Sequence, residues 1–171
     1  MTNWDHLVAI HGPAVWAVCS RLLGNRPSDT EECYQETWLT AWKASQRRTI
    51  AAWPAFLCSI ATSRALDRLR RRYRQRSIFG SPRPSGDDVL GEVASTEASP
   101  VETAIATELS ERLRAALAEL PARQSEMFSL HVLSDWSQPD IAREFEVSVN
   151  VVSVTIHRAR QRLRELLDEP H

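Results

Sequence analysis

The stretch SQPDIAREFEVSVNVVSVTIHRARQRLREL, residues 137–166, contains two runs of helical periodicity separated by a break. In the first run, Ile141, Ala142 and Phe145 share one helix face. Residues 146–148 interrupt the pattern. In the second run apolar side chains recur at steps of four, three, four and three, as one stripe of a long helix: Val152, Ile156, Ala159, Leu163 and Leu166. A short helix, a tight turn and a longer helix predict a helix-turn-helix.

The other face of the second run is polar and basic, with Asn150, Ser153 and His157 followed by several arginines. A helix of this kind after a tight turn has the geometry that places side chains in the major groove of DNA. The pattern therefore predicts that the chain binds DNA.

The composition favours an all-α protein of one domain or two small ones. Of the 171 residues, 43% are hydrophobic and only five are glycine, and no alternating apolar run of strand length occurs. The three cysteines, Cys19, Cys33 and Cys58, have no metal-ligand spacing and indicate buried free thiols in a reducing compartment. Without a signal sequence or an apolar run of about 18 residues, we expect a cytoplasmic protein with no membrane insertion.

Charge is segregated along the chain, although the net charge is only −1. Residues 64–76 contain seven arginines and the single acid Asp67, and basic side chains gather again within 158–164. Residues 77–120, between these two patches, are acidic. Two basic helical patches on either side of an acidic segment indicate a nucleic-acid partner.

These patterns divide the chain into three sections. Residues 1–76 are predicted to form a helical domain. Residues 77–100, rich in Gly, Pro, Ser and acid, are predicted to be a flexible linker, and residues 101–171 a second helical domain that contains the helix-turn-helix.

We also expect particular helix boundaries. The first domain should have an opening helix that Gly12-Pro13 kinks or interrupts, a second helix to about Ser45, and a third from about Ala55 through the arginines. Ser28 or Asp29 is the expected N-cap of the second helix. The second domain should have helices near 101–120 and 122–133, with 135–137 as the turn and cap before the helix-turn-helix.

Three stretches resemble, in order, the bacterial RNA polymerase sigma factors of the extracytoplasmic-function group in the sigma-70 family. SDTEECYQETWLTAWKAS, 28–45, is similar to the second-helix signature of the group, and WPAFLCSIATSRALDRLRRRYR, 53–74, to the helix that engages the promoter near −10. Residues 120–166 resemble the domain that reads the −35 element. The resemblance covers nearly the whole chain, and it implies a protein that binds core RNA polymerase and promoter DNA.

In this family the second-helix region binds a coiled coil of the largest polymerase subunit. The resemblance carries this role to Glu32, Gln35, Glu36, Trp38 and Trp42. Exposed acid, amide and aromatic groups suit an interface. Core packing of the two tryptophans, and a solvated surface role for Gln35 and Glu36, remain the alternatives.

The family also extracts a promoter base into a pocket near the loop before the third helix. That step needs a stacking surface and a basic cradle for the separated strand. The resemblance places these roles on Arg48, Trp53, Ser63, Arg64, Arg68, Arg71 and Arg72. The four helix arginines are expected to share one face. Simple burial of Trp53 and a solvated arginine face are the alternatives.

In the last domain the resemblance implies −35 contacts by the second helix of the helix-turn-helix. Base edges are expected to meet Asn150, Ser153, His157 and Arg158, and phosphates or polymerase to meet Arg160, Arg162 and Arg164. The family often has glycine where Glu146 stands in the turn, which predicts an altered turn geometry. Ser153 and Ser63 stand where the family has a basic residue and Asn, which predicts altered promoter preference.

Other functions compete with this interpretation. A helix-turn-helix transcriptional regulator that is not a polymerase subunit would not need the polymerase-binding pattern of 28–45. A protein that only sequesters polymerase would share the first domain alone. An enzyme is disfavoured because the five histidines are scattered and no glycine-rich phosphate loop occurs, so we expect no cofactor and no metal. By family habit, an anti-sigma factor is a further candidate partner.

Overall fold

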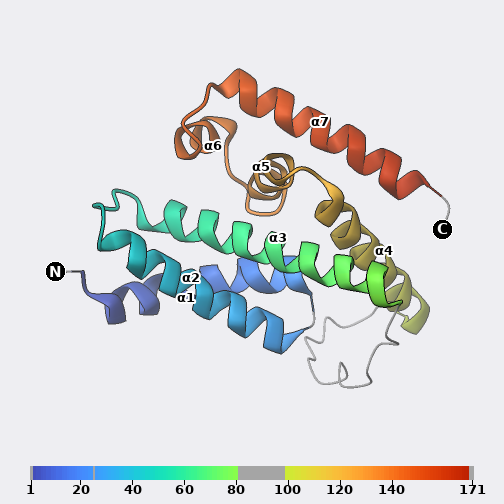
Figure 1. Ribbon diagram of the computed structural model, residues 1–171, viewed down its shortest axis with the longest axis horizontal. Helices are drawn as coiled ribbons and strands as arrows, with labels where there is room; N and C mark the ends of the chain where they lie inside the picture. Colours follow the sequence, from blue (N-terminus) through green and yellow to red (C-terminus); the bar gives the residue numbers. More distant parts are fainter. Residues whose placement is uncertain (1, 25, 81–98, 170–171) are drawn as a thin grey trace.

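A computed structural model describes residues 2–24, 26–80 and 99–169, and those ranges contain seven helices and no strand. The long helix α3, Trp53–Phe79, lies between two groups of helices (Figure 1). One group consists of α1, Trp4–Leu23, and α2, Pro27–Ser45. The other consists of α4, Pro100–Glu119, α5, Ala122–Val132, α6, Gln138–Glu144, and α7, Val149–Asp168. The predicted all-α class is confirmed.

Helices α1, α2 and α3 form a three-helix unit whose core follows the spacing of its apolar residues. From α1 and α3 the buried side chains are large, such as Leu22, Leu23, Leu57 and Leu66. From α2 they are small, namely Thr30, Cys33, Thr37 and Ala41. The large side chains of α2 are divided: Tyr34 and Trp38 are partly buried against the core, whereas Leu39 and Trp42 are exposed.

Helix α1 continues through Gly12 and Pro13, so the interruption predicted there does not occur. Proline removes one backbone hydrogen bond, but burial of Val15 and Val18 in the next turn holds the segment helical. Gly12 is needed for another reason: a Cβ there would lie 2.8 Å from the hydroxyl oxygen of Tyr34. By length and composition alone α1 could also cross a membrane, with a mean hydropathy of 1.2. Here it packs on α2 and α3 as a core helix.

The expected N-cap of α2 is wrong, and α3 begins two residues before the expected Ala55. Helix α2 begins at Pro27, and its N-cap residue Arg26 makes no side-chain cap. Asp29 lies inside the first turn, where its carboxylate accepts a hydrogen bond from Arg72 at 2.5 Å instead of capping the helix. Helix α3 begins at Trp53 because Pro54 suits a first helical turn.

Helices α6 and α7 form the predicted helix-turn-helix. Ser137 caps α6, as expected, by accepting a hydrogen bond from the Asp140 amide, and Ser148 caps α7 through the Val151 amide. The predicted stripe of α7 is buried from Val152 to Leu163. It packs against α4, α5 and α6.

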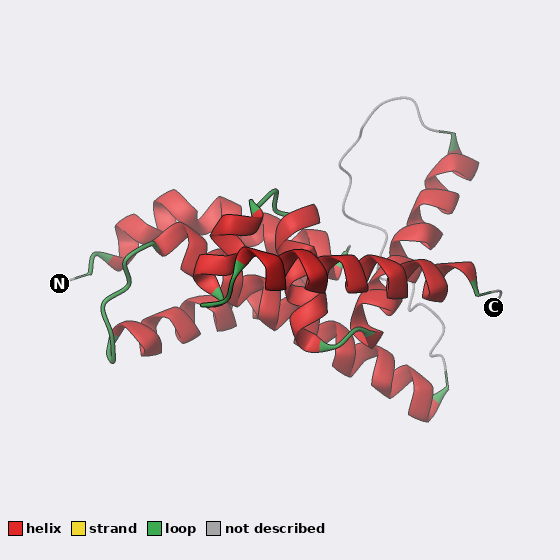
Figure 2. Cartoon of the chain, turned by 90° about the horizontal axis from the view of Figure 1, so that it is seen from above, coloured by secondary structure: helices red, strands yellow, loops and turns green. Residues whose placement is uncertain are grey.

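The two halves of the chain contact each other chiefly through α3, which packs against α4 and α5 and touches α6. Arg114 of α4 also donates to the Leu22 carbonyl of α1. Buried apolar residues of both halves belong to one contiguous cluster. Figure 2 shows the described ranges as helices joined by short loops. Most of the predicted linker, residues 81–98, lies outside the described residues, while 77–79 belong to α3 and Pro100 begins α4.

Candidate functional site

The solvent side of α7 presents a row of polar and basic side chains. It lies opposite the buried stripe and consists of Asn150, Ser153, His157, Arg158 and Arg162, all exposed. Arg162 donates a hydrogen bond to Glu165 at 2.9 Å. With side chains an α-helix is about 10–12 Å wide, which matches the major groove of about 12 Å. This face can therefore enter a major groove while α7 keeps its N-cap and its packing against the core.

The turn before α7 passes through a left-handed backbone conformation. Glu146 has φ 54°, a region in which Cβ crowds the backbone and which glycine occupies without that cost. Glu146 is exposed, so little burial of its side chain offsets the strain. The turn geometry is one that glycine would satisfy.

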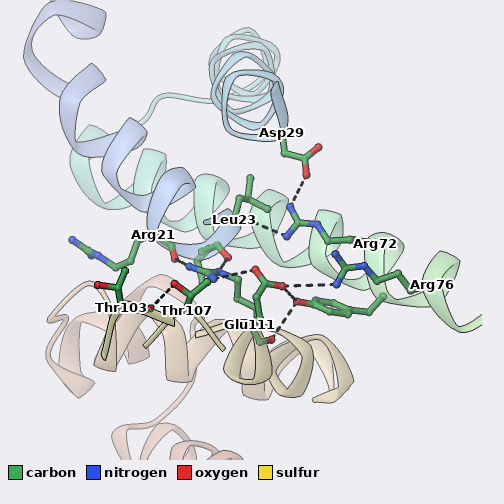
Figure 3. A network of polar contacts seen from close by, with 11 residues as sticks. Arg21, Leu23, Asp29, Arg72, Arg76, Thr103, Thr107 and Glu111 are labelled. Carbon is green, nitrogen blue, oxygen red and sulfur yellow. Dashed lines mark hydrogen bonds and ion pairs between the residues drawn. The ribbon is translucent and has the colours of Figure 1, made fainter. Parts of the chain in front are cut away.

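The arginines of α3 divide into two groups with different environments. Arg68 points to α2 and donates to Glu32 and to Glu36, both at 2.8 Å, and its side chain is only 14% exposed. Arg72 donates to Asp29 of α2 and to the Leu23 carbonyl at the end of α1 (Figure 3). These two arginines hold α3 on α2.

The remaining predicted arginines of α3, Arg64 and Arg71, make no hydrogen bond to α2 among the described residues, although Arg64 lines a small cavity with Thr40 of α2. Arg71 is exposed and Arg64 is partly buried, and neither forms an ion pair with any residue that the structure describes. Arg70, at the opposite edge, donates to Asp67 at 2.9 Å and to Ser125 of α5 at 2.5 Å. Arg64 and Arg71 thus keep their guanidinium groups available for phosphates.

The loop before α3 carries an aromatic and basic cluster. The Arg48 guanidinium lies over the Phe56 ring, 5.1 Å from its centroid. Trp53 is partly buried, with ring centroids 5.4 Å from Trp4 and 6.3 Å from Phe56. The loop lines a cavity of about 800 Å³ whose other wall includes residues of α6. A planar group entering this cavity would meet aromatic and guanidinium surfaces.

The outward side of α2 carries the residues predicted for polymerase binding. Glu32 and Gln35 are exposed, Glu36 is partly exposed, and Trp42 is 47% exposed. Trp38 is instead partly buried, with its ring centroid 6.0 Å from that of Tyr34. Sequence reasoning did not assign Leu39 to this surface, although it is 51% exposed and lies one turn from both Gln35 and Trp42.

Two carboxyl groups of the C-terminal half lie against the surface of α3. Burial raises the pKa of Glu126, while neighbouring Ser63 and Arg70 oppose the shift. Burial likewise raises the pKa of Glu144, opposed by Ser59 and Arg48. In the described ranges no group of three or more His, Cys, Asp or Glu side chains could hold a metal ion.

Both halves of the chain match known protein families. The family model for sigma-70 region 2 matches residues 7–75, and the model for sigma-70 region 4 matches residues 110–163. The chain is 31% identical over 169 residues to the RNA polymerase sigma factor CnrH of Cupriavidus metallidurans, covering 96% of this chain and 86% of CnrH. This chain is an extracytoplasmic-function sigma factor of the sigma-70 family.

Two further comparisons agree with this assignment. The sigma factor is 30% identical over 167 residues to the ECF RNA polymerase sigma factor SigE of Mycolicibacterium smegmatis, covering 98% of this chain and 62% of SigE. The fold resembles that of the sigma factor RpoE in its complex with the anti-sigma factor NepR from Bartonella quintana. Over the full length of both chains the identity is 22% and the TM-score is 0.56.

The structure places the predicted residues of this sigma factor on three separate surfaces. The −35 candidates share one exposed face of α7, and the polymerase candidates share the outer side of α2. The −10 candidates are divided: Arg48 and Arg71 are exposed, whereas Arg68 and Arg72 are used within the protein. Sequence reasoning could not separate them because all four helix arginines lie within one broad side of a helix.

Proposed function

We propose that this sigma factor docks on core RNA polymerase through the outer side of α2 and recognises a promoter with two other surfaces. The loop 46–52 and the outward side of α3 open and read a −10-like element, and α7 reads a −35-like element. That it directs promoter-specific initiation follows from its family. The division of labour among these surfaces is the proposal.

The observation that carries the proposal is the two-faced character of α7. Its apolar stripe is buried, while all five candidate −35 residues are exposed on the opposite face. Such a helix, capped by Ser148, is rigid enough to position side chains at base edges. Asn150, Ser153 and His157 are assigned to base edges, and Arg162 to a phosphate.

For the −10-like element, contact with the separated strand is assigned to Arg64 and Arg71, and stacking to the cluster around Trp53. A basic side chain that tracks a phosphate must have a free guanidinium group. Arg68 and Arg72 are positioning residues in this scheme, because they hold α3 against α2 rather than face a strand.

The partners are core polymerase and promoter DNA, and we place the protein in the cytoplasm, where both are found. RpoE, which shares this fold, was solved with an anti-sigma factor. An anti-sigma factor is therefore proposed as a third partner. We assign the protein no catalytic role of its own.

In vitro transcription on a genomic promoter library, with core polymerase in the presence and absence of the sigma factor, tests the proposal. Transcripts that depend on the protein and share two spaced upstream motifs are expected. Exchange of Asn150, Ser153 and His157 together should change only the −35-like motif. DNA binding without polymerase-dependent initiation would instead favour a regulator that is not a polymerase subunit.

Arg64→Ala with Arg71→Ala gives the matching test of the −10-like surface. Promoter opening, followed by permanganate reactivity of unpaired thymines, should fall because two phosphate contacts are lost. Binding to core polymerase should persist, since neither residue lies on α2. Equal loss of both activities would overturn the division of labour.

A further inference from the structure

The first two turns of α7 contain more valine side chains than the protein core takes up. Residues 149–154 include four valines, and of these only Val152 is buried. Val149, Val151 and Val154 are 45%, 43% and 40% exposed, respectively. Valine is also a poorer helix former than alanine, because its branched Cβ loses rotamer freedom in a helix. Neither burial nor helix propensity therefore explains the exposed valines.

Val154 lies at the centre of the side of α7 that points away from the protein. It stands midway in sequence between the buried residues Val152 and Ile156. At about 100° per residue, its side chain points roughly 180° away from their mean direction. Asn150 lies one turn before it and Arg158 one turn after it, and both are exposed. Figure 1 shows α7 along an outer edge of the molecule, where this side is open to a partner.

Val151 extends the apolar surface around Val154. The two residues are three positions apart, a spacing at which side chains on a helix are neighbours. Polar and basic side chains border the pair, among them His157 and Arg158. A partner that fits must offer an apolar group within a surface of hydrogen-bonding groups and negative charge. In the major groove of DNA that group is the C5-methyl of thymine.

We propose that Val154, with Val151 beside it, contacts the C5-methyl groups of thymine in the −35-like element and so determines promoter choice at those positions. The inference rests on the proposed reading of that element by α7. Adenine, guanine and cytosine present only hydrogen-bonding groups in the major groove. A valine beside thymine buries apolar surface on both groups, whereas a valine beside another base gains no such contact.

Duplexes selected from a random library define the motif that the protein reads. The selection is made with the full chain bound to core polymerase and also with the full chain alone. Each thymine of the −35-like motif is then replaced singly by deoxyuridine, which pairs with adenine in the same way and lacks only the methyl group. Binding by the wild type should fall about fourfold for at least one of these replacements, as expected for the loss of one buried methyl group.

Val154→Ala should make the protein insensitive to that methyl group. On the thymine duplex the variant should bind about fourfold more weakly than the wild type, and uracil at the sensitive position should cause little further loss. Val151→Ala tests the neighbouring contact in the same way. Val132→Ala is the matched control, because Val132 of α5 is 42% exposed, and it should keep the full sensitivity to uracil. Each variant introduces a better helix former, so unfolding is not expected.

The combination of protein variant and modified base separates a methyl contact from a structural effect. If the losses from Val154→Ala and from uracil simply multiplied, the valine and the methyl group would not touch, and the proposal would be wrong. A wild type that is insensitive to every uracil replacement, or a −35-like motif without thymine, would overturn it as well. Weaker binding of Val154→Ala to core polymerase, with unchanged sensitivity to uracil, would assign the valine to a protein interface and also overturn the proposal.

These measurements need no transcript, so their failure can be told apart from failure of the proposed function. A chain that selects a duplex and loses its uracil sensitivity in Val154→Ala, yet supports no initiation, would be a regulator that reads thymine through α7. Conversely, polymerase-dependent initiation together with a uracil effect that persists in both Val154→Ala and Val151→Ala would retain the proposed function and reject the role of these valines.

Discussion

At the scale of single residues, Glu146 has a strained backbone conformation in the turn that orients α7. With φ 54° the residue occupies a region that costs non-glycine residues about 1–2 kcal/mol. Glycine removes that cost but adds chain entropy to the unfolded state. We therefore expect Glu146→Gly to raise the free energy of unfolding by about 0.5–1 kcal/mol, measured by urea denaturation.

The matched control is Gln161→Gly, at an exposed position inside α7. There the backbone is helical, so glycine only adds unfolded-state freedom and should lower stability by about 1 kcal/mol. If both glycine variants were destabilised equally, the left-handed backbone at Glu146 would carry no strain.

Arg68 is a predicted DNA-binding residue that instead stabilises the fold. Two hydrogen bonds join it to Glu32 and Glu36, and its side chain is nearly buried. Arg68→Ala should lower the free energy of unfolding by about 2 kcal/mol. Arg71→Ala, in an exposed position one turn later, should change it by less than about 0.5 kcal/mol. Urea denaturation of the two variants compares them directly.

The outcome for Arg68 also bears on function. Glu32 and Glu36 lie on the candidate polymerase surface, so Arg68→Ala should weaken polymerase binding as well as promoter opening. A variant that retained full stability and lost only promoter opening would show that Arg68 contacts DNA. If Arg68 were replaced together with Arg64 and Arg71, loss of stability and loss of DNA contact could not be separated.

At the scale of helices, the sequence predicts α7 and the helix-turn-helix well because the signals are local. A stripe at steps of four and three, and the serine that caps α6, depend only on nearby residues. The course of α1 through Pro13 could not be predicted in this way. It depends on packing against α2 and α3, including the approach of Tyr34 to Gly12.

Helix α7 permits a separation of folding from recognition. Ser148→Ala removes the side-chain acceptor of the N-cap and should destabilise the protein by about 1 kcal/mol. Ser153→Ala, on the exposed face, should leave the urea midpoint nearly unchanged yet alter transcription from promoters that differ at the −35-like element. One variant should change stability and the other should change promoter preference. If both variants lost stability equally, Ser153 would have a structural role, and its assignment to the DNA-reading face would be wrong.

At the scale of the whole molecule, the sequence predicts the two halves but not their contact. Each half has its own apolar periodicity, whereas the contact uses isolated polar groups such as Tyr73, Glu111 and Arg114. No periodic signal marks such residues, because they bind backbone carbonyls and single side chains far away in the sequence. For the same reason, the sequence alone could not show which arginines of α3 form bonds within the protein. Their bonding partners in the structure separate Arg68 and Arg72 from Arg64 and Arg71.

Glu126 connects the contact between the halves to pH. Burial raises the pKa of this carboxyl, which lies among Ser63, Arg70, Asp67 and Arg123. The folded state therefore binds the proton more tightly than the unfolded state, and stability falls as pH rises through the interval between the two pKa values. Above that interval the charged carboxyl opposes docking of α5 on α3.

Glu126→Gln should therefore stabilise the protein modestly at neutral pH, because an amide carries no charge to bury. The difference from the wild type should shrink as pH falls through the raised pKa, where the native carboxyl becomes neutral as well. Urea midpoints over a pH series measure this, with Glu119→Gln on the exposed side of α4 as the control. A Glu126→Gln variant less stable than the wild type at neutral pH would mean that the carboxylate attracts Arg70 and Arg123 more than its burial costs. In that case Glu126 would help to close the two halves instead of limiting their contact.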